Sequence, residues 1–139
     1  MSTSDEKHPA FSARTSDPIY YKDATELAFL IRTKELSPRE VVQAHIDRID
    51  AVNPQINAIV TSLAEDALKA ADVAERAVMS GVALGPLHGV PFTIKDSIDT
   101  GGILTQRGSK LFKGYIPEKD APAVTRFKEA GGIPLAKTN

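Results

Sequence analysis

Residues 85–96 read GPLHGVPFTIKD, and the rest of the chain is interpreted from this stretch. Its first five residues contain two glycines and a proline and predict a tight loop, whereas residues 90–96 have the composition of a strand. Residues 77–94 carry no charged side chain, and Lys95 is the first charge after them. Three glycines and two prolines in this charge-free segment argue against a membrane-spanning helix. We therefore interpret it as the end of a helix, a tight loop and a buried strand.

The composition indicates one ordinary globular core. The chain has 139 residues, 42% of them hydrophobic, and its 17 basic and 18 acidic side chains give a formal net charge of −1. This balance argues against direct binding to nucleic acid or anionic lipid. The absence of cysteine excludes disulfides, thiolate zinc sites and cysteine nucleophiles and fits a reducing compartment. Because residues 1–22 also lack the apolar run of a secretory signal, we expect a cytoplasmic protein without a membrane partner.

Alternating helical and strand patterns predict an α/β fold. We expect a flexible tail over residues 1–22 and a folded but incomplete domain over 23–139. The final strand reaches the C-terminus with no element after it, although parallel strands need covering on both faces, so we expect a chain cut inside a βα unit. The predicted helices cover residues 23–35, 37–52, 63–79 and 120–130, and the predicted strands cover 57–61, 90–96 and 133–139.

Capping residues set the predicted helix boundaries. Ser37 and Glu40 form a capping box at the start of the second helix, and the same pattern recurs at Ser62. Pro54 is expected to end the second helix, because proline disfavours helix in the residue before it. Asp120 is expected to cap the last helix. Further expectations are a left-handed Gly81 after the third helix, inward-facing Val124 and Phe127, and a helix end at Gly131 and Gly132.

Lys95 is the candidate catalytic residue. In an extended strand its side chain shares a face with Pro91 and Thr93, and the adjacent Asp96 points away. A lysine buried without a charge partner is driven toward the neutral amine, which is a usable base. The alternative is a lysine that emerges at the strand end into solvent.

Other polar residues give weaker indications of function. The loop over residues 97–109 holds the small and hydroxyl residues that a substrate cleft uses, although such loops are usually only connections. Arg107 and Lys137 are interpreted as solvated or structural charges. The histidines are too scattered for a metal site, and no phosphate or dinucleotide motif is present, so we expect no cofactor and no metal. The loop residues in question are Thr100, Gly101, Gly102, Thr105, Gly108 and Ser109, and the histidines are His8, His45 and His88, of which His88 is the best placed to touch a ligand.

Residues 85–139 resemble the N-terminal part of the amidase signature family, whose members cleave carboxamide C–N bonds. The strings GPLHGVPFTIKD and AGGIPLAKTN carry the resemblance, which extends weakly back to about residue 23. It implies a large α/β domain with helices flanking a mixed sheet, and a Ser-cisSer-Lys triad whose lysine falls on Lys95. That lysine would be the neutral base that relays a proton, through a bridging serine, from the nucleophilic serine. Gln106 departs from the family pattern, which often has threonine there.

The resemblance also implies that a larger protein is needed for catalysis. Both family serines lie in a glycine- and serine-rich signature after the Lys-Thr-Asn region, and neither Ser97 nor Ser109 has a matching context. We therefore expect an amidase acting on a small-molecule amide in the full-length protein, and an inactive fragment in isolation. Two alternatives stay open: the A subunit of glutamyl-tRNA(Gln) amidotransferase, which has the same fold and triad, and a non-enzymatic truncated product. The long segment before residue 23 favours the stand-alone amidase.

Overall fold

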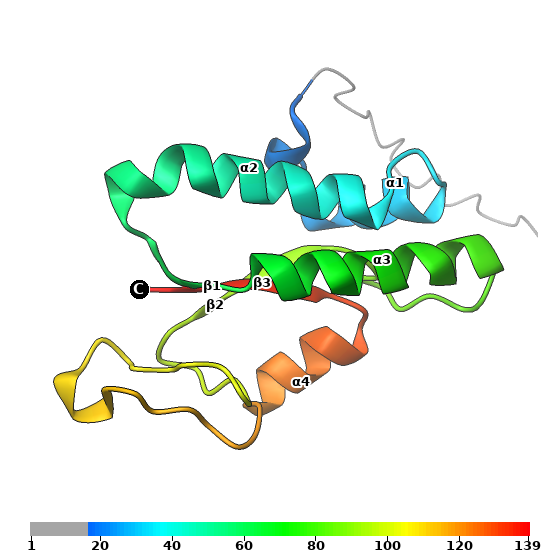
Figure 1. The fold of residues 1–139 in the computed structure, drawn as a ribbon. Coiled ribbons are helices and arrows are strands. Elements are labelled where there is room, and N and C mark those ends of the chain that lie inside the picture. The colour runs from blue at the N-terminus through cyan, green and yellow to red at the C-terminus, as the bar shows by residue number, and fades with distance from the viewer. Residues whose placement is uncertain (1–16) are drawn as a thin grey trace, which may run out of the picture.

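Helices and a three-stranded sheet alternate along the chain, as predicted for an α/β fold (Figure 1). The structure is a computed structural model and describes residues 17–139. The α-helices are α1 (Ala24–Arg32), α2 (Pro38–Ile56), α3 (Ala64–Ser80) and α4 (Pro122–Glu129). The strands are β1 (Ile59–Ser62), β2 (Pro91–Lys95) and β3 (Ile133–Thr138), and two short 3-10 helices are η1 (Ile19–Tyr21) and η2 (Lys110–Phe112).

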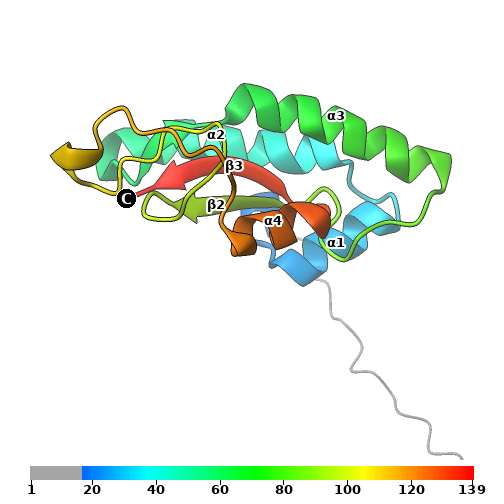
Figure 2. The ribbon, with the colours of Figure 1, turned by 90° about the horizontal axis from the view of Figure 1, so that it is seen from below.

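The sheet is mixed, with strand order β1-β3-β2. The central strand β3 runs antiparallel to β1 and parallel to β2, and Lys95 at the end of β2 lies opposite Thr138. Figure 1 shows α2 on one side of the sheet and α4 on the other, and α3 packs with α2 against β3. Figure 2, seen from the α4 side, shows β2 and β3 side by side. The carboxyl ends of the two parallel strands therefore meet at one edge of the sheet.

Two apolar clusters hold the helices in place. The larger joins α2, α3 and β3, where Ala67, Ala71 and Ala74 lie on the buried side of α3 at helical spacing. Alanine side chains at these positions allow α3 to lie close to the sheet. The second cluster joins α1 and the ends of α2 and α3 to Val90, directly before β2. The N-terminal helices therefore support the strand that carries Lys95.

The predicted capping box is confirmed. The amide of Glu40 donates to Ser37 Oγ at 3.1 Å, and the amide of Ser37 donates to a Glu40 carboxylate oxygen at 2.8 Å. The hydrogen bonds from the Ser37 backbone and side chain lower the pKa of Glu40. Gly81 has the predicted left-handed conformation, with φ of 73°, after α3.

The prediction that Pro54 ends the second helix is wrong. The helix continues to Ile56, and Pro54 lies inside its last turn. The reversal occurs instead at Asn57, which is left-handed with φ of 50°. Asn53 stabilises this turn, because its side chain accepts from the Ile59 amide at 2.9 Å and donates to the Ile59 carbonyl at 3.3 Å. These contacts with the first residue of β1 offset the local preference of the residue before proline.

Two other predicted caps are also wrong. Leu63, not Ser62, is the N-cap of α3 and makes no side-chain capping bond, whereas Ser62 Oγ accepts from the Ala64 amide at 3.3 Å from one position earlier. Ala121 precedes α4, also without a side-chain cap, because the Asp120 carboxylate accepts from the Gly101 amide at 2.7 Å and from Lys128 at 2.6 Å. Asp120 therefore joins the loop to the helix and does not cap it.

The last helix is less buried than its pattern predicts. Val124 is buried as expected, but Phe127 is 46% exposed. The Phe127 ring still stacks on Phe92 of β2, with ring centroids 5.1 Å apart. The helix ends as predicted at the glycines, with Ala130 as C-cap and Gly131 at φ of 91°.

A short helix lies before residue 23. Residues 19–21 form η1, and the guanidinium carbon of Arg48 on α2 lies 5.2 Å from the centroid of the Tyr20 ring. The remainder of the predicted tail, residues 1–16, lies outside the described residues.

The capping box predicts a stability effect. We expect Ser37→Ala to lower the free energy of unfolding by about 1 kcal/mol, because one amide at the start of α2 loses its acceptor. Ser80→Ala is the matched control: this exposed serine only donates to the Ala77 carbonyl at the other end of a helix, so its effect should stay within about 0.5 kcal/mol. Urea unfolding measures both, and equal effects would contradict the assigned role of Ser37.

The junction between α4 and the tight loop predicts a second effect. A Cβ on Gly131 would lie 2.7 Å from the His88 Cα, whereas a Cβ on Gly114 would meet nothing within 4 Å. Both glycines have positive φ, so both alanine variants should lose about 1 kcal/mol. Gly131→Ala should lose a further 1 to 3 kcal/mol, roughly, from the steric overlap. Equal midpoints for the two variants in urea would show that the close contact is unimportant.

Candidate functional site

Lys95 lies at the carboxyl end of β2 with its side chain exposed. Thr93, two residues earlier, is also exposed, whereas Ile94 and Asp96 are buried. The predicted alternation is therefore confirmed at the end of this strand, and Asp96 does point away from Lys95. No side-chain hydrogen bond or ion pair joins Lys95 to any residue in the described range 17–139. Of the two sequence interpretations, the structure shows the lysine that emerges into solvent.

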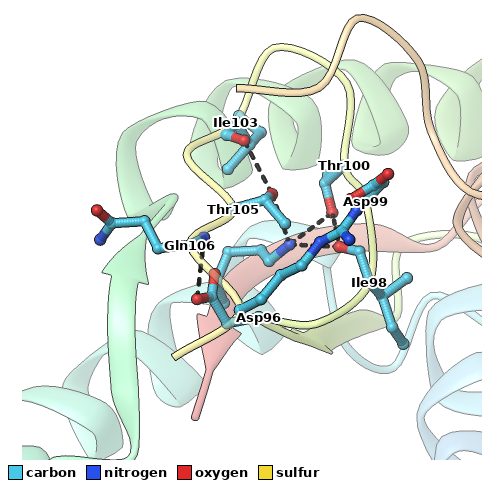
Figure 3. Close-up of polar contacts among 9 residues, drawn as sticks. Asp96, Ile98, Asp99, Thr100, Ile103, Thr105 and Gln106 are labelled. Carbon is cyan, nitrogen blue, oxygen red and sulfur yellow. Dashed lines mark hydrogen bonds and ion pairs between the residues drawn. The ribbon is translucent and has the colours of Figure 1, made fainter. Parts of the chain in front are cut away.

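Lys137 in β3 is the buried lysine of this region, with a relative exposure of 0%. Its ammonium group donates to the Ile98 carbonyl at 2.6 Å, to Thr100 Oγ1 at 2.9 Å and to Thr105 Oγ1 at 3.0 Å. An ammonium group has three N–H donors, so each has one acceptor. Figure 3 shows both threonine hydroxyls directed at the same nitrogen. The sequence indicated a solvated or structural charge at Lys137 but did not predict that its side chain is fully buried.

The hydroxyls of the two threonines in turn donate hydrogen bonds to backbone carbonyls. Thr100 Oγ1 donates to the Ile98 carbonyl at 3.2 Å, and Thr105 Oγ1 donates to the Ile103 carbonyl at 3.0 Å (Figure 3). Both threonines are 0% exposed, and no buried side-chain polar atom in the described part of the chain lacks a partner. The network is therefore fully satisfied, as a buried polar cluster requires.

Three carboxylates balance the buried charge at longer range. Removal from water lowers the pKa of Lys137, and the negative charges of Asp96, Asp99 and Asp120 offset part of that lowering. Burial alone would raise the pKa of Asp120, but its hydrogen bonds from Lys128 and Gly101 outweigh burial, so this pKa lies below its usual value. The site thus combines a buried cation with carboxylates on the surrounding loop.

The loop after β2 is fixed at several points. The Asp96 carboxylate accepts from the backbone amide of Gln106 at 3.1 Å (Figure 3), which closes the loop that contacts the Lys137 side chain. Arg107 pairs with Asp99 at 2.6 Å, and its guanidinium carbon lies 4.7 Å from the centroid of the Phe112 ring. Arg107 is thus the structural charge that the sequence indicated.

The remaining candidates from the sequence have structural contacts. Ser109 Oγ accepts from the Leu111 amide at the start of η2, and Gly101 donates to Asp120. His88 Nε2 lies 2.9 Å from the Ala74 carbonyl, and His45 Nδ1 lies 2.7 Å from the Val41 carbonyl. His8 lies outside the described residues. Gly102 and Gly108 both have positive φ in turns of the loop.

A shallow hollow of about 380 Å³ opens beside the carboxyl end of the sheet. Asp96, Gln106 and Ser109 are among its lining residues, together with Lys110 and Lys113. The hollow adjoins the end of β2 at Asp96, but Lys95 is not among its lining residues. Within residues 17–139, no group of three or more potential metal ligands occurs. No helix in that range is long and apolar enough to cross a bilayer.

Comparison with known proteins identifies the family. Residues 40–139 match the family described as Amidase. The chain is 43% identical over 122 residues to an indoleacetamide hydrolase from Bradyrhizobium diazoefficiens, covering 88% of this chain and 23% of that protein. It is 45% identical over 121 residues to the A subunit of the glutamyl-tRNA(Gln) amidotransferase from Carboxydothermus hydrogenoformans, covering 87% of this chain and 25% of the relative.

The fold agrees with this match. The crystal structure of a bacterial aryl acylamidase of the amidase signature family superimposes with a TM-score of 0.81 at 30% identity, covering 88% of this chain and 26% of that structure. The chain thus spans about a quarter of the length of the proteins that it matches. Since the family match covers residues 40–139, well over half of the sequence, the chain belongs to the amidase signature family.

Proposed function

We propose that this chain carries the catalytic base of an amide hydrolase and that Lys95 is that base. The observation that supports this most directly is the position of Lys95 at the carboxyl end of β2, in a chain that belongs to the amidase family. The Lys95 ammonium group has no hydrogen-bond or ion-pair partner among residues 17–139. The Lys95 nitrogen is thus accessible to a catalytic partner, which proton transfer requires.

The proposed mechanism is acyl transfer through a serine. A neutral Lys95 amine accepts a proton from a bridging serine, which in turn accepts one from the serine that attacks the amide carbonyl. The resemblance places both serines outside these 139 residues. Lysine becomes a usable base when its surroundings disfavour the charged form, and here the side chain is exposed. The remaining three quarters of an amidase would therefore have to supply both the nucleophile and the covering of the base.

The same proposal extends to the substrate class, the domain and the cellular compartment of the enzyme. The substrate is a small-molecule amide, and residues 23–139 are the N-terminal portion of one amidase domain. The isolated 139 residues are inactive, because a base without a nucleophile cannot form an acyl-enzyme. The cysteine-free sequence fits a reducing compartment, so we place the protein in the cytoplasm.

Similarity to the A subunits of glutamyl-tRNA(Gln) amidotransferases supports a second candidate function, transfer of ammonia within such a complex. The identity to the Carboxydothermus relative is 45% and that to the indoleacetamide hydrolase is 43%, so sequence identity does not distinguish the two functions. Grafts of this segment into both relatives separate the two functions. Restored amidotransferase activity in the Carboxydothermus protein without restored hydrolysis in the Bradyrhizobium enzyme would favour the second candidate.

The role of Lys95 is tested in a chimera. The matching segment of this chain replaces its counterpart in the Bradyrhizobium indoleacetamide hydrolase, and ammonia release from indoleacetamide is measured. We expect Lys95→Ala to lower kcat/KM by about 10² to 10⁴, the usual contribution of a positioned base. Lys95→Arg should lose as much, since a guanidinium group stays protonated and cannot accept the proton.

Lys119→Ala is the control for this experiment. Lys119 is an exposed lysine of the same long connection between β2 and α4, and its loss should leave kcat/KM within about twofold if only the base matters. Activity retained in both Lys95 variants, with the parent chimera active, would exclude Lys95 as the base.

A further inference from the structure

We propose that Lys137 is a positioning residue for Lys95. Its buried ammonium group fixes the loop over residues 97–106, and this loop holds the carboxyl end of β2 in the conformation from which Lys95 acts. The inference rests on the proposed function of Lys95 and adds a second lysine, with a structural role, to the site.

The first support is the cost of burying this side chain. A charged amine that leaves water without compensation destabilises a protein by several kcal/mol. Here the charge is compensated by three short hydrogen bonds and by Asp96, Asp99 and Asp120 at longer range. An apolar residue of similar length could fill the same space without this cost. Unlike an apolar side chain, the ammonium group forms directional hydrogen bonds, and its three donors specify where the acceptors of residues 98, 100 and 105 must lie.

The second support is a direct link from Lys137 to the backbone of Lys95. Lys137 holds the Ile98 carbonyl at 2.6 Å, and the Ile98 amide donates to the Lys95 carbonyl at 2.9 Å. The next residue of β3, Thr138, accepts from the Asp96 amide at 2.6 Å and lies opposite Lys95 in the parallel ladder. The consecutive residues Lys137 and Thr138 therefore hold Lys95 and Asp96 from two directions.

The geometry also assigns different roles to the two lysines. All three donors of Lys137 are occupied, and its side chain has no exposed surface through which a substrate or serine could approach. Lys95 is exposed and has no partner within the described residues. A base must exchange its proton with a neighbour in each cycle, which only Lys95 is placed to do.

The test uses threonine variants in the same chimera. Thr105→Val keeps the side-chain shape but removes the acceptor for Lys137, whereas Thr105→Ser keeps the hydroxyl. For Thr105→Val and for Lys137→Met we expect kcat for indoleacetamide to fall by about 10-fold to 10²-fold, the effect of a misplaced catalytic group. KM should change by less than about twofold, because substrate binding is not the step affected. Thr105→Ser should restore kcat.

Amide hydrogen exchange in the 139-residue chain gives a readout that does not depend on activity. Thr105→Val should speed exchange of the Ile98 and Asp96 amides by at least about tenfold, as local opening of the loop becomes easier. The Ile133 amide, which donates to the Val90 carbonyl at the other end of the sheet, should be unaffected and serves as the internal control. Equal acceleration at all three amides would indicate general destabilisation and overturn the inference.

The outcomes separate this inference from the proposed function. Activity lost in Lys95→Ala but retained in Thr105→Val and Lys137→Met would leave Lys95 as the base and overturn the positioning role. Activity retained in Lys95→Ala would overturn both the proposed function of Lys95 and the positioning role of Lys137, since Lys95 would not be the base. Equal losses in Thr105→Val and Thr105→Ser would assign the effect to side-chain packing and not to the hydroxyl, which also overturns the inference.

Discussion

The buried ammonium group of Lys137 is the constraint on which this end of the fold depends. A cation without exposed surface has to be surrounded by acceptors in fixed directions, and β3 alone offers none that can reach it. The loop that follows β2 supplies them by folding back over β3, with one backbone carbonyl and two threonine hydroxyls. The Lys137 side chain therefore fixes three points along residues 98–105, and the hydrogen bonds of Asp96 and Asp120 fix others.

Consecutive residues at the end of β2 contribute differently to this arrangement because side chains alternate along a strand. Lys95 points into solvent, whereas Asp96 is 7% exposed and closes the loop by accepting from the Gln106 amide. The negative charge of Asp96 also favours the charged form of Lys137. The Lys-Asp pair that follows the charge-free segment thus joins an accessible amine to a buried structural carboxylate.

The sequence correctly predicted features that depend on residues close together in the chain. The Ser37 capping box involves residues three apart, and Gly81 ends α3 by its own backbone conformation. Predictions failed where contacts outside the capping pattern decide the outcome. Pro54 stays helical because Asn53 holds the turn beyond it, and Asp120 is drawn from its capping position by Gly101, 19 residues earlier. The acceptors of Lys137 lie 32 to 39 residues away, and no periodicity or capping pattern indicates them.

The sequence did contain one clue to the buried site. A lysine within the predicted strand IPLAKTN, together with two threonines in the loop after Lys95, is the composition that a satisfied buried ammonium group needs. Considering the two lysines together also changes the argument for the base. The sequence argument required Lys95 to be buried within these residues, whereas the structure buries Lys137 and leaves Lys95 exposed. A buried lysine with every donor occupied is held in place and is closed to a substrate or a serine. Lys95 is exposed on a strand whose end Lys137 holds, so its backbone is fixed while its amine has no partner within residues 17–139. The proposed base needs a fixed backbone and an accessible amine, because another segment has to cover it.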